Sequence, residues 1–176
     1  MRPVRRAPRE QQALLVSSVV ASFQEAAATK YVLPFQFRSD VRGAARHHLV
    51  FLASGFEDYA GMKEVMARHG TAGGDTVASF EYIPGGLERR SVRSSADLRK
   101  DLAQELLDIY NGRTFTLGAL YRDHSVPTPY VMGDYIGALR GLEDTGCIHV
   151  QRGIGSGERA YDGPTSITFA ADRDHG

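Results

Sequence analysis

Residues 114–151 read TFTLGALYRDHSVPTPYVMGDYIGALRGLEDTGCIHVQ, and this stretch decides the fold of the C-terminal half of the chain. Thr116 precedes a short apolar helix pattern, which a turn follows. Thr128-Pro129 then has the form of a helix start, with Thr at the N-cap and Pro in the first helical position. The next helix pattern has an apolar inner face and runs to Thr145-Gly146, where glycine is expected to end it. The residues of that inner face are Val131, Tyr135, Ala138, Leu139 and Leu142. The stretch therefore predicts two helices joined by a short turn.

Patterns on both sides extend this motif into a complete small domain over residues 95–171. An upstream helix starts at Ser94 or Ser95, and a stripe of apolar side chains marks its inner face: Leu98, Leu102, Leu106 and Ile109. Downstream, Ile148–Gln151 and Ser166–Ala170 read as strands joined by a glycine-rich loop. The order is helix, short strand, helix, turn, helix and hairpin, which is the plan of a winged helix-turn-helix domain.

Residues 10–84 predict a separate α/β unit. Glu10–Ala28 has a helical pattern, and Lys30–Phe37 reads as a strand in which Pro34 favours an edge position or a bulge. His47–Ala53 is nearly continuously apolar from Leu49, so it predicts a strand buried on both faces.

The rest of this unit predicts one more helix and one more strand. Ser54, followed three residues later by Glu57, has the spacing of a capping box for a helix that runs to about His69. Thr76–Ile83 alternates as a strand does. Residues 1–9 are expected to be a disordered basic arm, and residues 85–94 a linker between the two units.

The composition favours a soluble protein that binds its ligands through local patches. The 176 residues are 42% hydrophobic and 24% charged, and 21 Lys and Arg balance 21 Asp and Glu. A neutral chain has no overall attraction to nucleic acid or to an anionic membrane. A single cysteine leaves no internal disulfide, and no apolar run is long enough for a membrane span. We expect a cytoplasmic protein.

No pattern in the sequence forms a catalytic, cofactor or metal site. Ser156 lies between two glycines but lacks the strand-to-helix context of a nucleophile elbow. His47 and His48 are adjacent in a predicted strand, so their side chains point to opposite faces and do not easily share one ion. No glycine-rich turn joins a strand to a helix as a dinucleotide or phosphate site requires.

Basic residues in and around the predicted winged helix leave two ligand classes open. The third helix of such a domain usually enters the major groove, and the wing contacts the backbone. The candidate nucleic-acid contacts are Arg140 on that helix, Arg152 and Arg159 in the wing, and Arg89 and Arg90 in the linker. Strong DNA readers usually present several polar or cationic side chains on this helix, and here Arg140 is its one outward cation. A domain used for contact with a protein is therefore an equal alternative.

Several motifs together resemble the C-terminal part of the three-Cys-motif partner protein family. Lys30–Phe37 and His47–Ala53 are followed by Gly61-Met62-Lys63-Glu64-Val65-Met66, and later by Thr128-Pro129-Tyr130 and Ala138–Gly146. In that family a Rossmann-like methyltransferase domain ends in such a strand pair and helix, and a winged helix follows. The similarity covers roughly residues 10–170. The family often has Trp after the second Met, where this chain has Ala67.

The resemblance implies an α+β fold, in which a partial Rossmann-type sheet, made of a hairpin and flanking helices, precedes a winged helix-turn-helix domain. The methyltransferase front half, which would carry the S-adenosylmethionine residues, has no counterpart here, so no catalytic or cofactor residue carries over. We expect an accessory winged-helix module for nucleic acid or a partner protein. The alternative is the non-catalytic portion of a split S-adenosylmethionine-dependent methyltransferase.

The resemblance also sets expectations about partners. DNA or RNA, a separate methyltransferase half and a three-Cys-motif protein are the candidates, in a bacterial defence or mobile-element setting. A homo- or hetero-oligomer is expected, because a two-stranded hairpin needs further strands or helices against it and an open strand edge recruits other chains.

The chain is predicted not to bind S-adenosylmethionine by itself. An adenosine cofactor needs a glycine-rich turn between a first strand and a helix, and the sequence contains none. Isothermal titration of the purified chain should therefore show no heat of binding. Stoichiometric binding with micromolar affinity would contradict this prediction.

Overall fold

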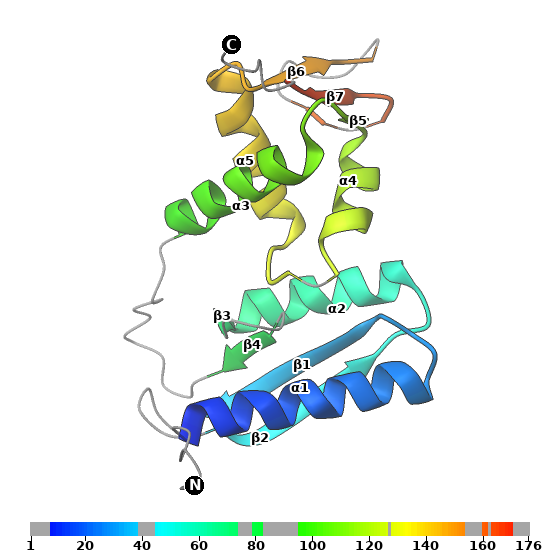
Figure 1. Cartoon of the computed structure of the whole chain (residues 1–176), viewed down its shortest axis with the longest axis vertical. Coiled ribbons are helices and arrows are strands. Elements are labelled where there is room, and N and C mark those ends of the chain that lie inside the picture. The colour runs from blue at the N-terminus through cyan, green and yellow to red at the C-terminus, as the bar shows by residue number, and fades with distance from the viewer. Residues whose placement is uncertain are drawn as a thin grey trace, which may run out of the picture. The chain divides into compact units, whose positions relative to one another are not determined.

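The computed structural model describes residues 8–38, 45–73, 79–82, 95–126, 128–153, 160–161 and 163–170. The chain divides into two compact units: residues 1–91 with 126–129, and residues 92–125 with 130–176. The described residues contain five helices and seven strands, and the strands form two separate sheets. The fold is therefore α+β (Figure 1). None of the helices in these ranges combines the length and apolar character needed to cross a membrane.

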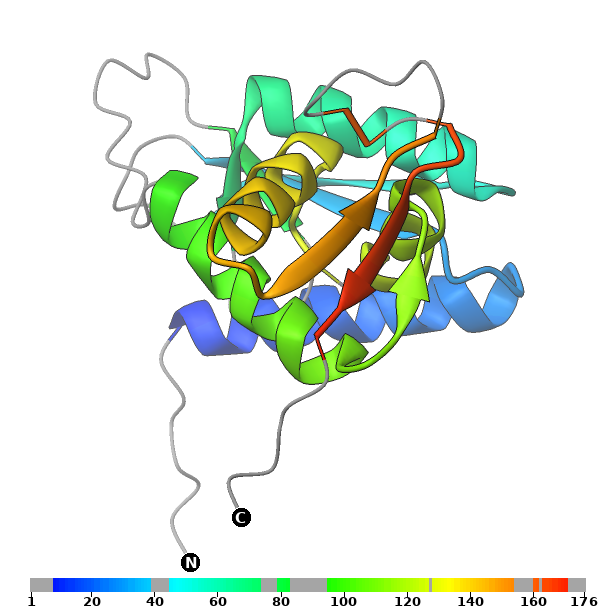
Figure 2. The same ribbon diagram turned by 90° about the horizontal axis from the view of Figure 1, so that it is seen from above.

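The first unit is a four-stranded sheet between two helices. Its elements are α1 (Pro8–Ala26), β1 (Val32–Arg38), β2 (Ala45–Leu52), α2 (Phe56–His69), β3 (Thr71–Gly73) and β4 (Ser79–Tyr82). The strand order is β2-β1-β4-β3, with β1 and β4 parallel and the other two pairings antiparallel. Figures 1 and 2 show α1 and α2 on opposite faces of this sheet.

Strand β1 lies between β2 and β4, so of the two alternatives predicted from Pro34 the edge position is wrong, whereas the register with β2 does shift, as in a bulge, between Phe37 and Arg38. Val32, Leu33, Pro34 and Phe35 are all buried, as expected of a strand covered on both faces. The proline is tolerated because β1 pairs with β4 only over Phe35–Phe37, so no ladder bond to β4 is needed at Pro34.

Strand β2 is an edge strand, and the prediction that it is buried on both faces is also wrong. Among the described strands its only partner is β1, in a register that sets Leu49 opposite Phe35 and Leu52 opposite Val32. Leu49 is 49% exposed and Leu52 37% exposed. An apolar run alone does not distinguish a central strand from an edge strand with apolar neighbours.

Helix α2 covers the sheet through one stripe of side chains. Tyr59, Lys63 and Met66 are buried, and the Tyr59 ring lies 5.7 Å from the ring of Tyr31. The Tyr59 hydroxyl donates to the carbonyl of Val126 at 2.6 Å, within the same unit. The capping box predicted at Ser54 does not form, because the helix begins one residue later, with Gly55 at the N-cap and no side-chain cap.

The second unit contains three helices and a three-stranded antiparallel sheet. Its elements are α3 (Ser95–Tyr110), β5 (Thr114–Phe115), α4 (Leu117–His124), α5 (Met132–Asp144), β6 (Ile148–Gln151) and β7 (Ser166–Phe169). The strand order is β5-β7-β6, so the last strand of the chain lies between the other two.

The core of this unit lies where α3 packs against α5. Leu102 and Leu106 of α3 and Tyr135 and Leu139 of α5 are fully buried. Their spacing of four residues puts each pair on one helix face, which confirms the stripes predicted from the sequence. Ile109, which the sequence also assigned to the inner stripe, is 53% exposed, because the buried stripe continues from Leu106 to Tyr110, four residues on.

The helix ends in this unit are set by local chemistry. Thr116 caps α4 as predicted, since its hydroxyl accepts from the Ala119 amide at 3.3 Å. Gly146 has a φ of +73°, which confirms the predicted glycine stop after α5. The predicted start at Thr128-Pro129 is wrong: α5 begins at Met132, and the Asp134 carboxylate accepts from the Val131 amide at 3.0 Å.

Truncating the packed face of α5 is predicted to destabilise the second unit. Leu139→Ala should lower the free energy of unfolding by about 2 to 5 kcal/mol, because the side chain is fully buried and leaves a cavity. Ile109→Ala is the matched control on α3, and at 53% exposure it should cost no more than about 0.5 kcal/mol. Urea unfolding followed by circular dichroism measures both. Equal losses for the two variants would refute the core assignment.

Candidate functional site

Two of the five arginines predicted to contact nucleic acid, Arg140 and Arg152, lie in the described part of the chain. Arg140 is exposed on the third turn of α5, and Arg152 follows β6 at the start of the loop to β7. The predicted contacts Arg159, Arg89 and Arg90 lie outside the described residues, as do the linker and Ser156.

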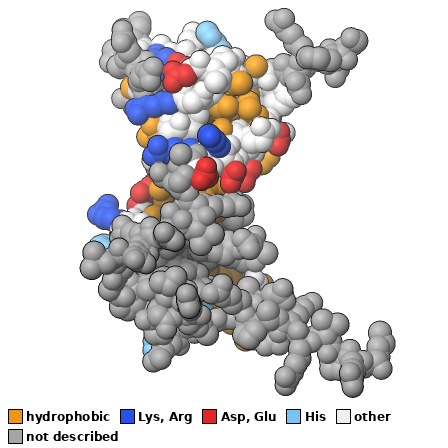
Figure 3. All heavy atoms as spheres, turned by 90° about the vertical axis from the view of Figure 1, so that its left-hand side faces the viewer, with side chains coloured by type: hydrophobic (Ala, Val, Ile, Leu, Met, Phe, Trp, Pro, Cys, Tyr) orange, Lys and Arg blue, Asp and Glu red, His pale blue; other side chains and the backbone are white. Residues whose placement is uncertain are grey.

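A second arginine from α3 lies near Arg140. A Cβ atom added to Gly137 would come within 2.6 Å of Nε of Arg99, so the guanidinium of Arg99 lies against the bare backbone of α5. Gly137 is one turn before Arg140, and Arg99 is itself exposed. In the space-filling view of this unit, basic and acidic side chains are interspersed and apolar ones lie between them (Figure 3).

Arg152 is engaged by α5 instead of being presented to solvent. Its two terminal nitrogens donate to the two carboxylate oxygens of Glu143 at 2.7 and 2.8 Å. The Tyr161 hydroxyl donates to the same carboxylate at 2.8 Å, and the Arg152 guanidinium lies 5.7 Å from the Tyr161 ring centroid. We call these three residues the Glu143 clamp, because they join both described ends of the β6–β7 connection to α5.

The surroundings of the clamp disfavour ionisation of Tyr161. Burial, followed by the hydrogen bond to Glu143, raises the pKa of Tyr161 above its usual value, although Arg152 and Arg140 oppose the shift. The hydroxyl, which is a donor at neutral pH in any tyrosine, is therefore still harder to ionise here.

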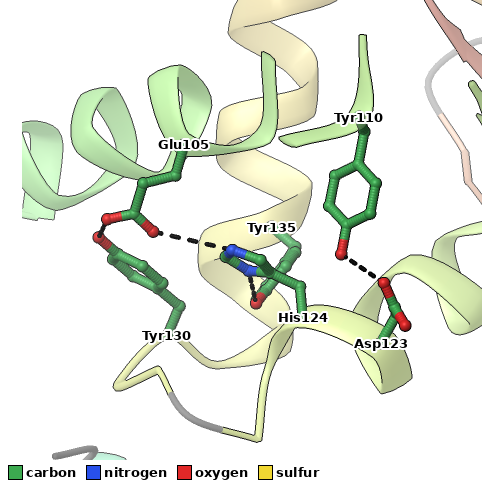
Figure 4. Close-up of polar contacts among 6 residues, drawn as sticks. All are labelled: Glu105, Tyr110, Asp123, His124, Tyr130 and Tyr135. Atoms are coloured by element: carbon green, nitrogen blue, oxygen red, sulfur yellow. Dashed lines mark hydrogen bonds and ion pairs between the residues drawn. The ribbon is translucent and has the colours of Figure 1, made fainter. Parts of the chain in front are cut away.

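A second polar cluster links the three helices inside the unit (Figure 4). His124, the last residue of α4, is buried, and its Nδ1 lies 2.7 Å from the Tyr135 hydroxyl on α5. Its Nε2 lies 3.8 Å from a carboxylate oxygen of Glu105 on α3. The other oxygen of Glu105 accepts from the Tyr130 hydroxyl at 3.1 Å.

The order carboxylate, imidazole, hydroxyl is also that of a catalytic triad, but here it is suited to packing. A nucleophilic hydroxyl must reach a substrate, and Tyr135 is fully buried. Nearby, the Tyr110 hydroxyl donates to Asp123 at 2.7 Å (Figure 4), and burial followed by this hydrogen bond raises the pKa of Tyr110. We infer that these residues satisfy one another and fix the angles between the helices.

The histidines of β2 were the other candidate ligands. His47 and His48 pair with Phe37 and Gln36, so their side chains lie on opposite faces of the sheet. The pKa of His48 is lowered, first by burial and then by the neighbouring His47. Within the described ranges, no three His, Cys, Asp or Glu side chains are grouped as a metal site would need.

Comparison with known proteins adds no relative: no family model, no curated protein and no solved structure matches this chain.

Arg140 and Arg152 were predicted from the sequence as contacts, whereas the acidic and aromatic residues Glu143 and Tyr161 were not. These two residues determine which groups Arg152 can bind. Glu143 is nine residues before Arg152, across a helix end and a strand, and no local spacing signals that pairing. Glu105 and His124 are likewise joined only by the packing of α3 and α4.

Removing the charge of Glu143 is predicted to loosen the clamp. Glu143→Gln loses both charge-assisted bonds to Arg152 and weakens the acceptor for Tyr161, so it should lower the free energy of unfolding by about 1 to 3 kcal/mol. Asp144→Asn is the matched control, because that carboxylate is exposed and its loss should cost at most about 1 kcal/mol. Thermal unfolding at pH 7 compares them. If Asp144→Asn costs as much as Glu143→Gln, the clamp is not a specific stabilising contact.

Proposed function

We propose that the chain is a non-catalytic binding module whose second unit is a winged-helix domain acting on a partner protein. Support for this fold family comes from the order α3, β5, α4, α5, β6, β7 and from the antiparallel sheet that includes the short strand β5. In such a domain α5 is the helix that meets the ligand, and the β6–β7 connection is the wing.

The observation that carries the choice of ligand is the Glu143 clamp. Its carboxylate holds Arg152 in a bidentate pair, so the described base of the wing offers no unengaged guanidinium for phosphates. The C-terminal half of α5 presents Arg140 together with Glu143 and the exposed Asp144. A surface of mixed charge suits a protein, whereas duplex DNA favours clustered cations.

Weak nucleic-acid binding is the second candidate, and the pair Arg99 and Arg140 favours it. Both are exposed, and Arg99 of α3 lies against Gly137, which is one turn before Arg140 on α5. Binding through two such cations would be dominated by phosphate contacts and would weaken steeply with salt.

For the first unit we propose a relation to the Rossmann-type sheet of three-Cys-motif partner proteins. Support comes from the motifs in the sequence, from the parallel pairing of β1 and β4, and from helices on both faces of the sheet. On this proposal the chain is an accessory protein. The split-methyltransferase alternative would gain support if a neighbouring reading frame encoded the glycine-rich strand–helix start.

Nucleic-acid binding is predicted to be absent at physiological salt. In fluorescence anisotropy with labelled duplex DNA and RNA, the chain should show no saturable binding at about 150 mM salt and at most weak binding at about 20 mM. Arg140→Glu should abolish any low-salt binding, and Arg68→Glu, an exposed cation on α2 of the first unit, should leave it unchanged. Tight binding at about 150 mM salt that Arg140→Glu removes would overturn the proposal.

A separate photocrosslinking experiment tests the protein partner directly. A photocrosslinking amino acid at position 140 should give an adduct in cells that resists nuclease and is degraded by protease. The same label at position 68 of the first unit is the control. A nuclease-sensitive adduct at position 140 would favour the nucleic-acid candidate instead.

A further inference from the structure

Most of the exposed apolar surface of the described chain lies in one part of the first unit. Seven of the nine large apolar side chains with high exposure belong to α1, β1 and β2: Leu14, Leu15, Val19, Phe23, Phe37, Leu49 and Leu52. Their exposed fractions range from 37% to 67%. Because Leu49 and Leu52 are three residues apart in β2, their side chains lie on opposite faces of the sheet, so exposed apolar side chains flank this edge on both faces.

Helix α1 is unusual for a surface helix because residues 11–23 contain no charged side chain. Val20 is buried toward β1, whereas Leu15, Val19 and Phe23, spaced by four residues, form an exposed stripe beside it. A helix with one face on a sheet normally carries charged residues on its other faces. Residues 11–23 of this helix therefore cannot form ion pairs with a charged partner.

Strand β2 provides an open sheet edge next to this helix. It pairs with β1 along one side only, over Ala45–Leu52, and the side chains of residues 47–52 include no acidic group that would oppose pairing. An edge of this length with exposed apolar side chains is a template for another strand. Natural edges are usually protected by charges or proline, and β2 carries a single such residue, Arg46 near its start, whereas positions 47–52 contain neither lysine nor proline.

We propose that the occupant is a second copy of this chain, which pairs β2 with β2 of the first copy in an antiparallel, two-fold symmetric sheet. The geometry favours a copy because an antiparallel strand is its own complement. Two antiparallel neighbours are related by an axis perpendicular to the sheet, and that axis puts the α1 helices of both copies on the same face. One contact thus covers the strand edge and brings both uncharged helices to the axis.

Symmetry also restricts the register. Because side chains alternate between faces, the axis must set one residue opposite itself. We assign that position to Leu49, which is 49% exposed. His48 of one copy then lies opposite Val50 of the second copy, and His47 opposite Phe51 of the second copy. Centring on His48 would instead set two imidazoles against each other. In the Leu49 register, neighbouring β1 strands lie about 14 Å apart across the axis, so the helices on them flank it.

Crosslinking tests this register directly in the full-length chain. With the native thiol removed by Cys147→Ser, Leu49→Cys should form an inter-chain disulfide on mild oxidation. Facing residues of antiparallel strands have Cα atoms about 4.5 to 5.5 Å apart, which is within disulfide range. Leu52→Cys is the matched control on the same strand: its two copies would lie about 20 Å apart and should not crosslink. Equal crosslinking at both positions, or crosslinking at position 52 alone, would overturn the proposal.

Light scattering after gel filtration tests the dimer itself. The wild-type chain should elute with twice the monomer mass, and Leu49→Lys should weaken the dimer by at least about tenfold, because it sets two like charges opposite each other. Val65→Lys on α2, a 45% exposed position away from this surface, should leave the dimer intact. A wild-type monomer at about 100 μM would refute the proposal. The result does not depend on the function proposed for the second unit, since every residue in the contact belongs to the first.

Discussion

The bidentate pair between Glu143 and Arg152 determines how the second unit presents its surface. Both side chains are about three-quarters covered, with 26% and 20% exposure, so the pair is worth more than an ion pair in open solvent. Tyr161 adds a third bond to the same carboxylate. The β6–β7 connection is therefore held at both described ends. Arg152, which the sequence suggests as a ligand contact, instead stabilises the fold through Glu143. Charge counted along a chain overstates the charge that a partner meets.

The polar cluster around the buried His124 fixes the helices inside the unit. His124 lies between Tyr135 and Glu105, so one imidazole is shared by α3, α4 and α5. Apolar contacts such as Leu106 with its neighbours tolerate small shifts between helices, whereas hydrogen bonds weaken steeply when their geometry changes. The cluster therefore specifies one arrangement of the helices, in which the Tyr135 hydroxyl is fully buried and Glu105 at the other end is 44% exposed.

Predictions from the sequence were most accurate for features that depend on residues close together in the chain. The apolar stripes of α3 and α5, the Thr116 cap and the Gly146 stop follow from spacing within a few residues, and all are confirmed except Ile109 at the end of the α3 stripe. The predictions failed where the position of a strand or the pairing of a side chain depends on a residue distant in the sequence. Pro34 suggested an edge, but the strand is central because β4, over forty residues later, pairs beyond the proline. In the candidate site, Arg152 was found, whereas its partner Glu143 was not, because packing alone brings the two together.

Strand β2 combines the apolar sequence of a buried strand with an edge position in the sheet. Leu49–Leu52 is as apolar as a doubly covered strand, yet within the monomer it forms an edge with Leu49 half exposed. Burying a leucine is worth about 1.5 to 3 kcal/mol relative to leaving it in water. A chain that keeps such residues at a strand edge forgoes that stabilisation in the monomer and recovers it only on association. The proposed pairing of β2 with a second copy would cover this strand edge, which the described residues of one chain leave unpaired.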